Sequence, residues 1–235
     1  MQNFAESFWS ALALIVTGDA ELWFIVVLSL QVSMTAVVLA ALIGVPTGAL
    51  LAVGKFPGRQ VIIIFVNSLM GLPPVVVGLC VYLILSRSGP LGVLDLLYTP
   101  IAMIIAQTIL ITPIIAALSR NTIQAVHEEY RDQFLSLCLS GWQRLRSLLW
   151  EARFSLLTAL LAGFGRAIAE VGAVMIVGGN INHLTRVMTT SIALETSKGN
   201  LSLALALGAI LVLIAILVNA AIAVIGMLRR EAIHV

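Results

Sequence analysis

The chain has 235 residues, of which 60% are hydrophobic and only 10% are charged, and its formal net charge is +2. About a quarter of the residues of an ordinary soluble domain are charged, so this composition excludes a water-soluble globular protein. The basic residues are scattered and form no patch for nucleic acid, which we exclude as a partner. The composition predicts an integral membrane protein.

Residues 1–21 form a separate N-terminal segment. They contain Glu6, Asp19 and Glu21 but no Lys or Arg, so the basic region of a cleavable signal peptide is missing and we expect the segment to be retained. Its apolar residues are spaced like one face of a helix: Phe4, Phe8, Trp9, Leu12 and Ile15. We expect an extracytoplasmic or interfacial segment that is too short for a sixth span.

The rest of the chain predicts five membrane spans and an all-α fold, a polytopic transmembrane helical bundle. A crossing needs about 20 apolar residues, and lipid offers backbone groups no partners, so apolar segments of this length must be helices. Four long stretches carry no charge, and a fifth is interrupted only by Arg166 and Glu170. The predicted spans are about 22–54, 60–86, 96–119, 154–177 and 200–228.

The basic residues predict the orientation. Lys and Arg accumulate in cytoplasmic loops, and alternate loops here differ clearly, with nine basic residues in one set and three in the other. The richer set includes the loop 120–153 and the tail 230–235. We therefore predict that the N-terminus lies outside and the C-terminus in the cytoplasm.

Four prolines are expected to break or kink helices, because proline removes a helix hydrogen bond. They are Pro46, Pro73, Pro74 and Pro113. Such breaks occur in transporters where helices rock or gate, and a kink without a gating role is at least as common for any single proline.

The cytoplasmic loop 120–153 is expected to form two short helices. Acidic residues at 128–132 begin the first, and Ser140-Gly141 separates it from a second that starts at Trp142. An amphipathic element needs a cover for its apolar side. Either it lies on the membrane surface or it is a docking surface for a soluble partner.

Arg166 and Glu170 are the most distinctive local signal, because charges within a membrane are normally paired or face water. Their spacing places them on one helical face. One interpretation is a self-neutralising structural pair, and the other is a position beside a translocation path.

Catalytic motifs are absent from the sequence. It contains no G-x-x-x-x-G-K-[ST] phosphate cradle and no H-E-x-x-H zinc motif. Cys80 and Cys138 are expected to be inert packing residues. We expect no enzymatic activity, no metal and no cofactor in this chain.

Three stretches resemble the permease subunits of binding-protein-dependent ABC importers, specifically the branch that takes up molybdate, tungstate, sulfate and phosphate. The first is Leu72-Pro-Pro-Val-Val-Val-Gly78, the second is the loop 120–153, and the third is Arg166-Ala-Ile-Ala-Glu-Val-Gly-Ala173 followed by Gly179-Asn180. The likeness spans about 22–229. Residues 167–196 look most like tungstate permeases, with molybdate permeases close behind.

Family permeases carry a cytoplasmic E-A-A-x3-G signature in a coupling helix that sits in a cleft of the ATPase. Aligned here, it falls on Asp132-Gln133-Phe134 with Cys138 at the glycine position, and Glu151 replaces a later proline. The match rests on position and amphipathic character more than on identity. The resemblance implies these ATPase-coupling residues: Glu128, Glu129, Asp132, Phe134, Leu137, Cys138, Leu139, Gly141 and Trp142.

The resemblance also implies a type I ABC importer fold like that of molybdate permeases. It implies a homodimer in a bacterial or archaeal plasma (inner) membrane, with two cytoplasmic ATPase subunits that hold ATP-Mg and an extracytoplasmic oxyanion-binding protein. Tungstate is the expected substrate, and molybdate, sulfate or phosphate are the alternatives. The expected path residues are Arg166, Glu170, Asn180 and Thr189.

Two other classes of protein compete with this interpretation. In a stand-alone secondary transporter or channel, Arg166 and Glu170 would relay ions, and the amphipathic loop would have no partner. A membrane-embedded enzyme would need a cluster of nucleophile, base or metal ligands, which the sequence does not contain.

Overall fold

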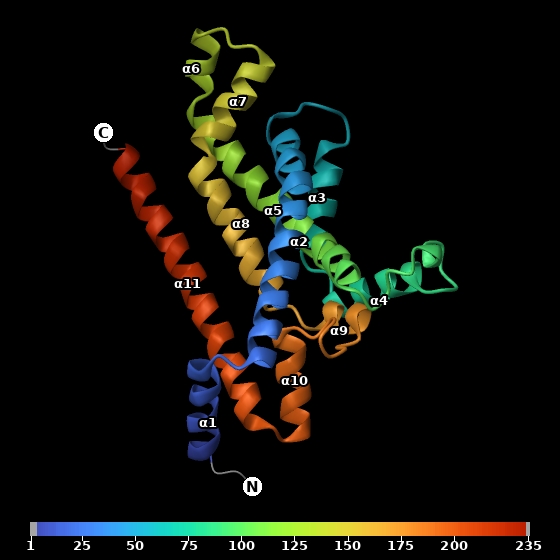
Figure 1. Cartoon of the computed structure of the whole chain (residues 1–235). Helices are drawn as coiled ribbons and strands as arrows, with labels where there is room; N and C mark the ends of the chain where they lie inside the picture. The colour runs from blue at the N-terminus through green and yellow to red at the C-terminus, as the bar shows by residue number, and fades with distance from the viewer. Residues whose placement is uncertain (1–3, 234–235) are drawn as a thin grey trace. The chain divides into compact units, whose positions relative to one another are not determined.

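We analysed a computed structural model, which describes the backbone of residues 4–233 and the side chains of residues 7–227. Within this range all regular elements are helices (Figure 1). The predicted tail 230–235 lies outside the described side chains. The elements are α1 (Phe4–Thr17), α2 (Ala20–Val53), α3 (Arg59–Leu69), α4 (Pro74–Leu85), the short 3₁₀ helix η1 (Gly92–Leu94), α5 (Pro100–Glu129), α6 (Arg131–Ser136), α7 (Gly141–Glu151), α8 (Arg153–Ile168), α9 (Gly172–Gly178), α10 (Met188–Lys198) and α11 (Leu201–Ile233).

Three of these helices, α2, α5 and α11, are long and apolar enough to cross a bilayer. The number rises to five if α3 with α4, and α7 with α8, each count as one broken span. α1 has 14 residues and is about 21 Å long at 1.5 Å per residue, short of a 30 Å hydrocarbon core. Its Phe8, Trp9 and Leu12 are exposed and its Ala11 is buried, and its interfacial role stays a prediction.

Pro46 and Pro113 do not break their helices, whereas a kink or a gating role at either position stays a prediction. Pro46 lies inside α2 and Pro113 inside α5, and both helices continue through the proline. A proline removes one hydrogen bond of the ladder, and in a long apolar helix the remaining bonds keep the helix intact. In contrast, Pro73 and Pro74 lie at a break. Pro73 is the extended N-cap of α4, and Pro74 takes the first helical position, where an N–H is not needed.

Two helix boundaries also differ from the prediction. The span expected at 154–177 is interrupted at 169–171, where α8 has ended and α9 has not begun. In addition, α5 continues ten residues beyond the expected end at 119. A ladder of side-chain hydrogen bonds supports this extension, from Arg120 to Gln124 (3.0 Å) and from Gln124 to Glu128 (2.9 Å).

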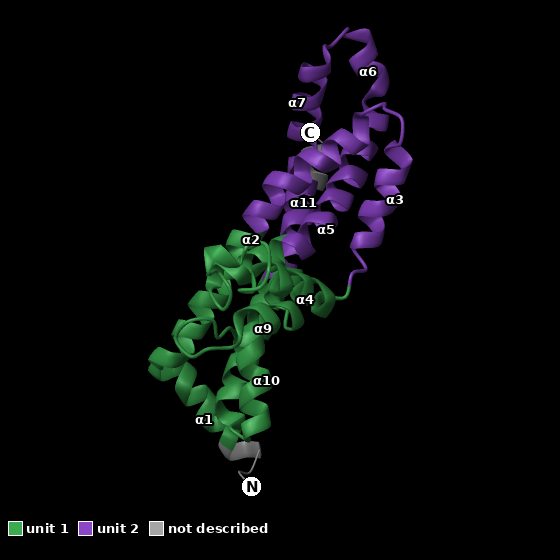
Figure 2. Ribbon diagram, turned by 90° about the vertical axis from the view of Figure 1, so that its right-hand side faces the viewer, with its two compact units in different colours: residues 1–36, 73–108, 165–217 green, residues 37–72, 109–164, 218–235 purple. Residues whose placement is uncertain are grey.

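The chain divides into two compact units (Figure 2). Unit 1 comprises residues 1–36, 73–108 and 165–217, and unit 2 comprises residues 37–72, 109–164 and 218–235. Four helices, α2, α5, α8 and α11, contribute residues to both units.

Unit 2 has an apolar core that joins five helices. We call it the α6–α7 anchor, because it holds α6 and α7 against α2, α5 and α8. Burial of such side chains contributes roughly 1.5–3 kcal/mol each for the larger ones. Its buried members are Ala49, Ala52, Ile123, Val126, Phe134, Leu148, Ala152 and Leu156.

Candidate functional site

The connection between α6 and α7 is a sharp, well-capped turn. Cys138 has a left-handed backbone with a φ of 50°, a conformation that glycine adopts most readily, in keeping with its place at the glycine of the coupling signature. Ser140 then caps α7, because its hydroxyl accepts a hydrogen bond from the Gln143 N–H while Gln143 Oε1 accepts one from the Ser140 N–H (2.9 Å). The turn therefore holds α6 and α7 in a fixed relation.

One face of this helix pair is buried and the other is open. Phe134 and Leu148 are buried in the anchor, and Leu139 packs against it. Phe134, expected to touch a partner, therefore faces the protein's own core, where its ring stacks on Tyr130 with centroids 6.0 Å apart. Phe134 attaches α6 to unit 2.

The other side of the α6–α7 pair, which we call the open face, is exposed and carries large apolar side chains. Its large exposed side chains are Leu135, Leu137, Trp142 and Trp150. The Arg153 guanidinium lies over the Trp150 ring, 4.4 Å from its centroid. A groove of ≈ 750 Å³ runs along α7, lined by Trp142, Leu145, Arg146, Ser147, Leu149, Trp150 and Glu151.

Unit 1 brings together two of the three stretches that carry the family resemblance. α4, which begins at Pro74, packs on α9, which begins at Gly172. A Cβ atom at Gly78 would lie 2.8 Å from the Ala173 Cα, so only glycine allows this approach of the two backbones. Next to it, a Cβ at Gly172 would lie 2.8 Å from a methyl group of Val75. The small residues of both stretches therefore form one packing contact.

Glu170 occupies the break between α8 and α9 and is bonded to three elements. Its Oε2 pairs with the Arg166 guanidinium at 3.2 Å, and its Oε1 accepts a hydrogen bond from the Ala173 N–H at 3.3 Å. Its backbone carbonyl accepts a hydrogen bond from the Thr189 hydroxyl of α10 at 2.7 Å. The Glu170 side chain is 5% exposed and that of Arg166 is 44% exposed. Glu170 is thus a fixed junction, and Arg166 is the accessible member of the pair.

Further buried polar groups surround this junction. Gln107 of α5 donates from Nε2 to the Ala167 carbonyl (3.1 Å), and Ser29 of α2 accepts from the Met188 N–H (2.8 Å). Gln107 Oε1 is buried without a partner among the described residues. It borders a cavity of ≈ 10 Å³, which is about the size of one water molecule. A tetrahedral oxyanion is far larger than this cavity.

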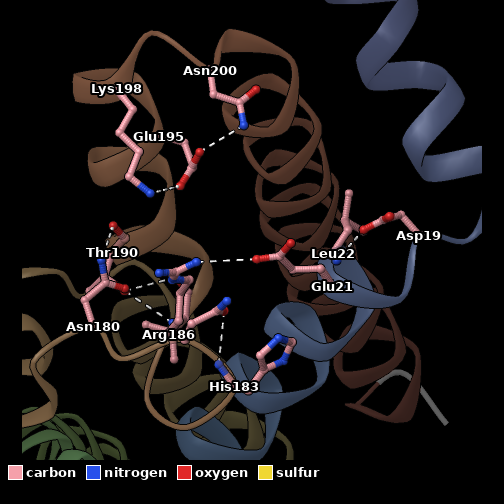
Figure 3. Close-up of polar contacts among 12 residues, drawn as sticks. Asp19, Glu21, Leu22, Asn180, His183, Arg186, Thr190, Glu195, Lys198 and Asn200 are labelled. Carbon is pink, nitrogen blue, oxygen red and sulfur yellow. Dashed lines mark hydrogen bonds and ion pairs between the residues drawn. The ribbon is translucent and has the colours of Figure 1, made fainter.

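The four expected path residues therefore do not form one site. Arg166, Glu170 and Thr189 lie together, whereas Asn180 belongs to a different network. Asn180 accepts from the Thr190 hydroxyl at 2.9 Å, as Figure 3 shows. With a φ of 51°, Asn180 follows the left-handed Gly179 in the turn after α9, so its contacts are those of a turn residue.

A second polar network lies near Asn180 (Figure 3). Arg186 pairs with Glu21 at 3.4 Å. Glu195, which is buried, accepts from the Lys198 ammonium at 2.9 Å and from the Asn200 amide at 2.9 Å. The Lys198 hydrogen bond is the main reason why the pKa of Glu195 is lowered, and burial acts in the opposite direction. The Asn200 contact ties α10 to the residue before α11, and the Arg186 pair ties the segment before α10 to the start of α2.

The sequence did not identify Gln107, Ser29 or Glu195 as site residues. Gln107 and Ser29 are polar residues inside long apolar stretches, and polar side chains in membrane spans often mark buried contacts. Their partners cannot be found in this way, because Gln107 bonds a residue 60 positions away and Ser29 one 159 positions away.

The described polar groups hold structure rather than perform chemistry. The Glu170 carboxylate and the Thr189 hydroxyl are engaged with neighbouring groups, so they do not form a nucleophile and a base. Within the described part of the chain, three or more His, Cys, Asp or Glu residues do not gather where they would hold a metal ion. The described polar groups therefore join neighbouring helices to one another.

The comparisons with known proteins agree with this geometry. Residues 44–228 match the family described as binding-protein-dependent transport system inner membrane component. The chain is 44% identical over 211 residues to a probable anion ABC transporter permease protein of Haloferax volcanii, an alignment that covers 86% of this chain and 91% of the relative.

Two further relatives are tungstate uptake system permease proteins named TupB. That of Peptoclostridium acidaminophilum is 40% identical over 222 residues (94% of this chain and 97% of the relative). That of Campylobacter jejuni is 38% identical over 214 residues (91% and 90%).

A chain with three to five helices that could cross a membrane and a family match over residues 44–228 is the membrane component of a transport system. The chain belongs to the family of binding-protein-dependent transport system inner membrane components, the permeases of ABC importers. Its fold is therefore that of a type I ABC importer permease, and it is a multi-pass membrane protein.

Proposed function

We propose that this chain is the pore-forming subunit of an ATP-driven importer for a tetrahedral oxyanion, with tungstate as the first substrate and molybdate as the second. The observation that carries the proposal is 38–40% identity to two tungstate uptake permeases over nine tenths of the chain. Sulfate and phosphate are the remaining alternatives within the same family. Two copies of the chain would form the pore, with the N-terminus outside and the C-terminus in the cytoplasm.

Energy would enter through α6 and α7. Leu135 and Leu137 are exposed on the open face of this pair. Phe134 and Leu148 are buried in the anchor and fix the pair to unit 2. This arrangement suits a separate ATPase subunit that binds the open face and moves the pair as one piece. The ATP-Mg of that subunit would close the ATPase dimer, and the motion would turn the helices from inward-open to outward-open.

Selection of the anion would take place mainly in an extracytoplasmic binding protein. Within the pore, Arg166 would be the residue placed best for a contact, because its side chain is 44% exposed and its pair with Glu170 engages one guanidinium nitrogen. Glu170 would position Arg166, and Thr189 would hold the Glu170 backbone. Asn180 serves the turn after α9 and is not needed for this role.

Substrate choice can be measured with the assembled transporter in liposomes. The purified permease, its ATPase and its binding protein are reconstituted, and ATP-driven uptake is followed with tungstate alone and in competition with molybdate or sulfate. We expect tungstate to be taken up and to be displaced by molybdate better than by sulfate. Uptake by the permease alone along an ion gradient would instead favour a secondary transporter.

ATPase docking can be measured separately. The double variant Leu135→Asp with Leu137→Asp places two charges on the open face and should abolish co-purification of the ATPase while the permease still folds. The matched control is Leu139→Asp, which should lower thermal stability because Leu139 packs on the anchor. If the double variant retained both the ATPase and uptake, the α6–α7 pair would have no role in coupling.

A further inference from the structure

The break between α8 and α9 leaves helix ends whose backbone groups need hydrogen-bond partners from outside the helix. Gln107 of α5 supplies one partner, because its Nε2 donates to the Ala167 carbonyl in the last turn of α8 (3.1 Å). Ser29 of α2 supplies another, since its hydroxyl accepts from the Met188 N–H at the start of α10 (2.8 Å). Side chains of α2 and α5 therefore cap the helix ends that meet at this junction.

Two buried side-chain oxygens at the same junction have no partner among the described residues. The Gln107 amide is held by its bond to α8, and its Oε1 is buried without a hydrogen bond. Ser33 follows Ser29 by one turn of α2 and is 2% exposed. The Ser29 hydroxyl donates to the Ile25 carbonyl at 2.6 Å, whereas the Ser33 hydroxyl makes no hydrogen bond within the described part of the chain. Buried polar groups almost always have a partner, which is either protein or an ordered water.

Gln107 and Ser33 both line the cavity of ≈ 10 Å³ beside Glu170, so their oxygens border the same small space. The nine lining residues all belong to unit 1, and each of them is at most 8% exposed. The cavity is therefore shielded from bulk solvent. Its lining residues are Ser29, Val32, Ser33, Gln107, Ile168, Glu170, Val187, Met188 and Thr189.

The size and the charge of this cavity select its ligand. A tetrahedral oxyanion does not fit, and an apolar guest would leave both oxygens without a hydrogen bond. A metal cation is disfavoured because the Glu170 carboxylate already pairs with Arg166 at 3.2 Å. Ca²⁺ and Mg²⁺ also take about six or more oxygen ligands. A water molecule fits the volume and needs only two to four polar partners.

We propose that this cavity binds one water molecule, which accepts a hydrogen bond from the Ser33 hydroxyl and donates one to Gln107 Oε1. The water joins α2 to α5 beside Glu170 and, through the Gln107 amide, to the end of α8. It completes the hydrogen bonds of the junction that side chains alone leave unmade. The proposal depends neither on the identity of the transported anion nor on the number of copies in the assembly.

Hydroxyl radical footprinting can detect this water. X-ray radiolysis of a bound water produces a radical that oxidises the side chains beside it. The chain offers a matched pair of methionines, because Met188 and Met103 are both 0% exposed and Met188 lines the cavity whereas Met103 does not. In the whole chain in lipid nanodiscs, we expect several-fold more oxidation at Met188 than at Met103. Equal oxidation of the two residues would overturn the proposal.

Two variants test whether the named oxygens hold the water. Ser33→Val replaces the hydroxyl by a methyl group and fills the cavity, and Gln107→Leu removes the acceptor. In either variant, oxidation of Met188 should fall to the level of Met103, with helical circular dichroism as the check on folding. Ser68→Val on the exposed surface of α3 is the control and should leave Met188 oxidation unchanged. Undiminished oxidation of Met188 in both folded cavity variants would overturn the proposal.

A double-mutant cycle tests the bridge by stability. Ser33→Ala and Gln107→Leu remove the same water-mediated link, so together they should lower the melting temperature by less than the sum of their separate effects. Val32→Ala combined with Gln107→Leu is the packing control, because Val32 lines the same cavity without a polar group. If Ser33 and Gln107 were coupled no more strongly than Val32 and Gln107, the two oxygens would not share a water.

The melting temperature also distinguishes water from a bound monovalent cation. It is measured in sodium, potassium and choline chloride at one ionic strength, for wild type and for Gln107→Leu. A water site predicts the same difference between the two proteins in all three salts. A difference that grows in sodium or in potassium alone would assign the cavity to that cation and overturn the proposal.

Discussion

Gly78 of α4 and Ala173 of α9 lie so close that a methyl group on Gly78 would be 2.8 Å from the Ala173 Cα. The two residues are 95 positions apart in the sequence, yet each belongs to a short run that resembles the oxyanion permeases. Their approach explains why a glycine stands at position 78 and small residues stand at positions 172 and 173. It also makes the α4–α9 contact sensitive to one added carbon atom.

Gly78→Ala should therefore destabilise the protein by about 1–3 kcal/mol, the usual cost of overpacking. For a chain of this length that is a fall in melting temperature of about 2–4 °C per kcal/mol, measurable in detergent by intrinsic fluorescence. Gly208→Ala is the matched control. Gly208 lies in α11, where an added Cβ would meet open space, so alanine there should be neutral or slightly stabilising. Equal losses in both variants would contradict the close contact.

Replacement of Arg166 and replacement of Glu170 should destabilise the protein by different amounts. Arg166→Gln leaves a buried carboxylate without its cation and should cost about 2–3 kcal/mol, less than for a pair in which both members are buried. Glu170→Gln leaves a half-exposed guanidinium and should cost less. The double variant should be more stable than Arg166→Gln alone. Thermal melts of the three variants decide this, and strictly additive losses would show that the pair does not interact.

The same pair offers a test of the transport role. Arg166→Lys keeps a positive charge but not the forked donor geometry. If Arg166 contacts the anion, this variant should raise the KM for uptake while the melting temperature changes little. An unchanged KM would leave Arg166 a purely structural partner of Glu170.

Cys138→Gly should stabilise the α6–α7 turn. A non-glycine residue with a left-handed backbone costs of order 1 kcal/mol, which glycine relieves. Cys80→Gly is the opposite control, because Cys80 lies inside α4, where glycine costs about 1 kcal/mol. Differential scanning fluorimetry should show a higher melting temperature for the first variant and a lower one for the second. A fall for Cys138→Gly would contradict the assigned turn conformation.

The contribution of Glu195 should depend on pH. The Lys198 hydrogen bond holds its pKa below the ordinary value of 4.5, so the folded state favours the charged form. This stabilisation is complete above pH 4.5 and is lost as the pH falls through the lower pKa of the folded state. The melting temperature of Glu195→Gln should therefore lie below that of wild type at pH 7, and the gap should close at acidic pH. Glu21→Gln leaves Arg186, whose side chain is only 12% exposed, without its partner at 3.4 Å, so this variant should itself lower the melting temperature at pH 7.

The long helices were predictable from the sequence because their signal is local. Runs without charge placed α2 and α11 within two residues of their observed starts. The sequence did not predict helix ends that depend on contacts with residues distant in the chain. A proline does not by itself decide whether a helix stops. Pro74 is the first residue of α4, whereas α2 continues through Pro46. At the break 169–171 the Glu170 carbonyl accepts a hydrogen bond from Thr189, a partner 19 positions away that the local sequence does not reveal.

The candidate site was predictable only in part. The charges of Arg166 and Glu170 stood out in an apolar stretch, and their pairing followed from their spacing. The spacing of Arg166 and Glu170 does not show which of them is accessible, because accessibility depends on the packing of other helices around them. Phe134 illustrates the same limit, because an aromatic residue in an amphipathic segment can face a partner or its own core.

The α6–α7 anchor has a mechanical consequence. Phe134 and Leu148 are buried among side chains of α2, α5 and α8, and the capped turn at Ser140 leaves little slack between α6 and α7. A force applied to the open face is therefore not absorbed by bending of a soft linker. It displaces the parts of α2, α5 and α8 that pack against the anchor at the same time.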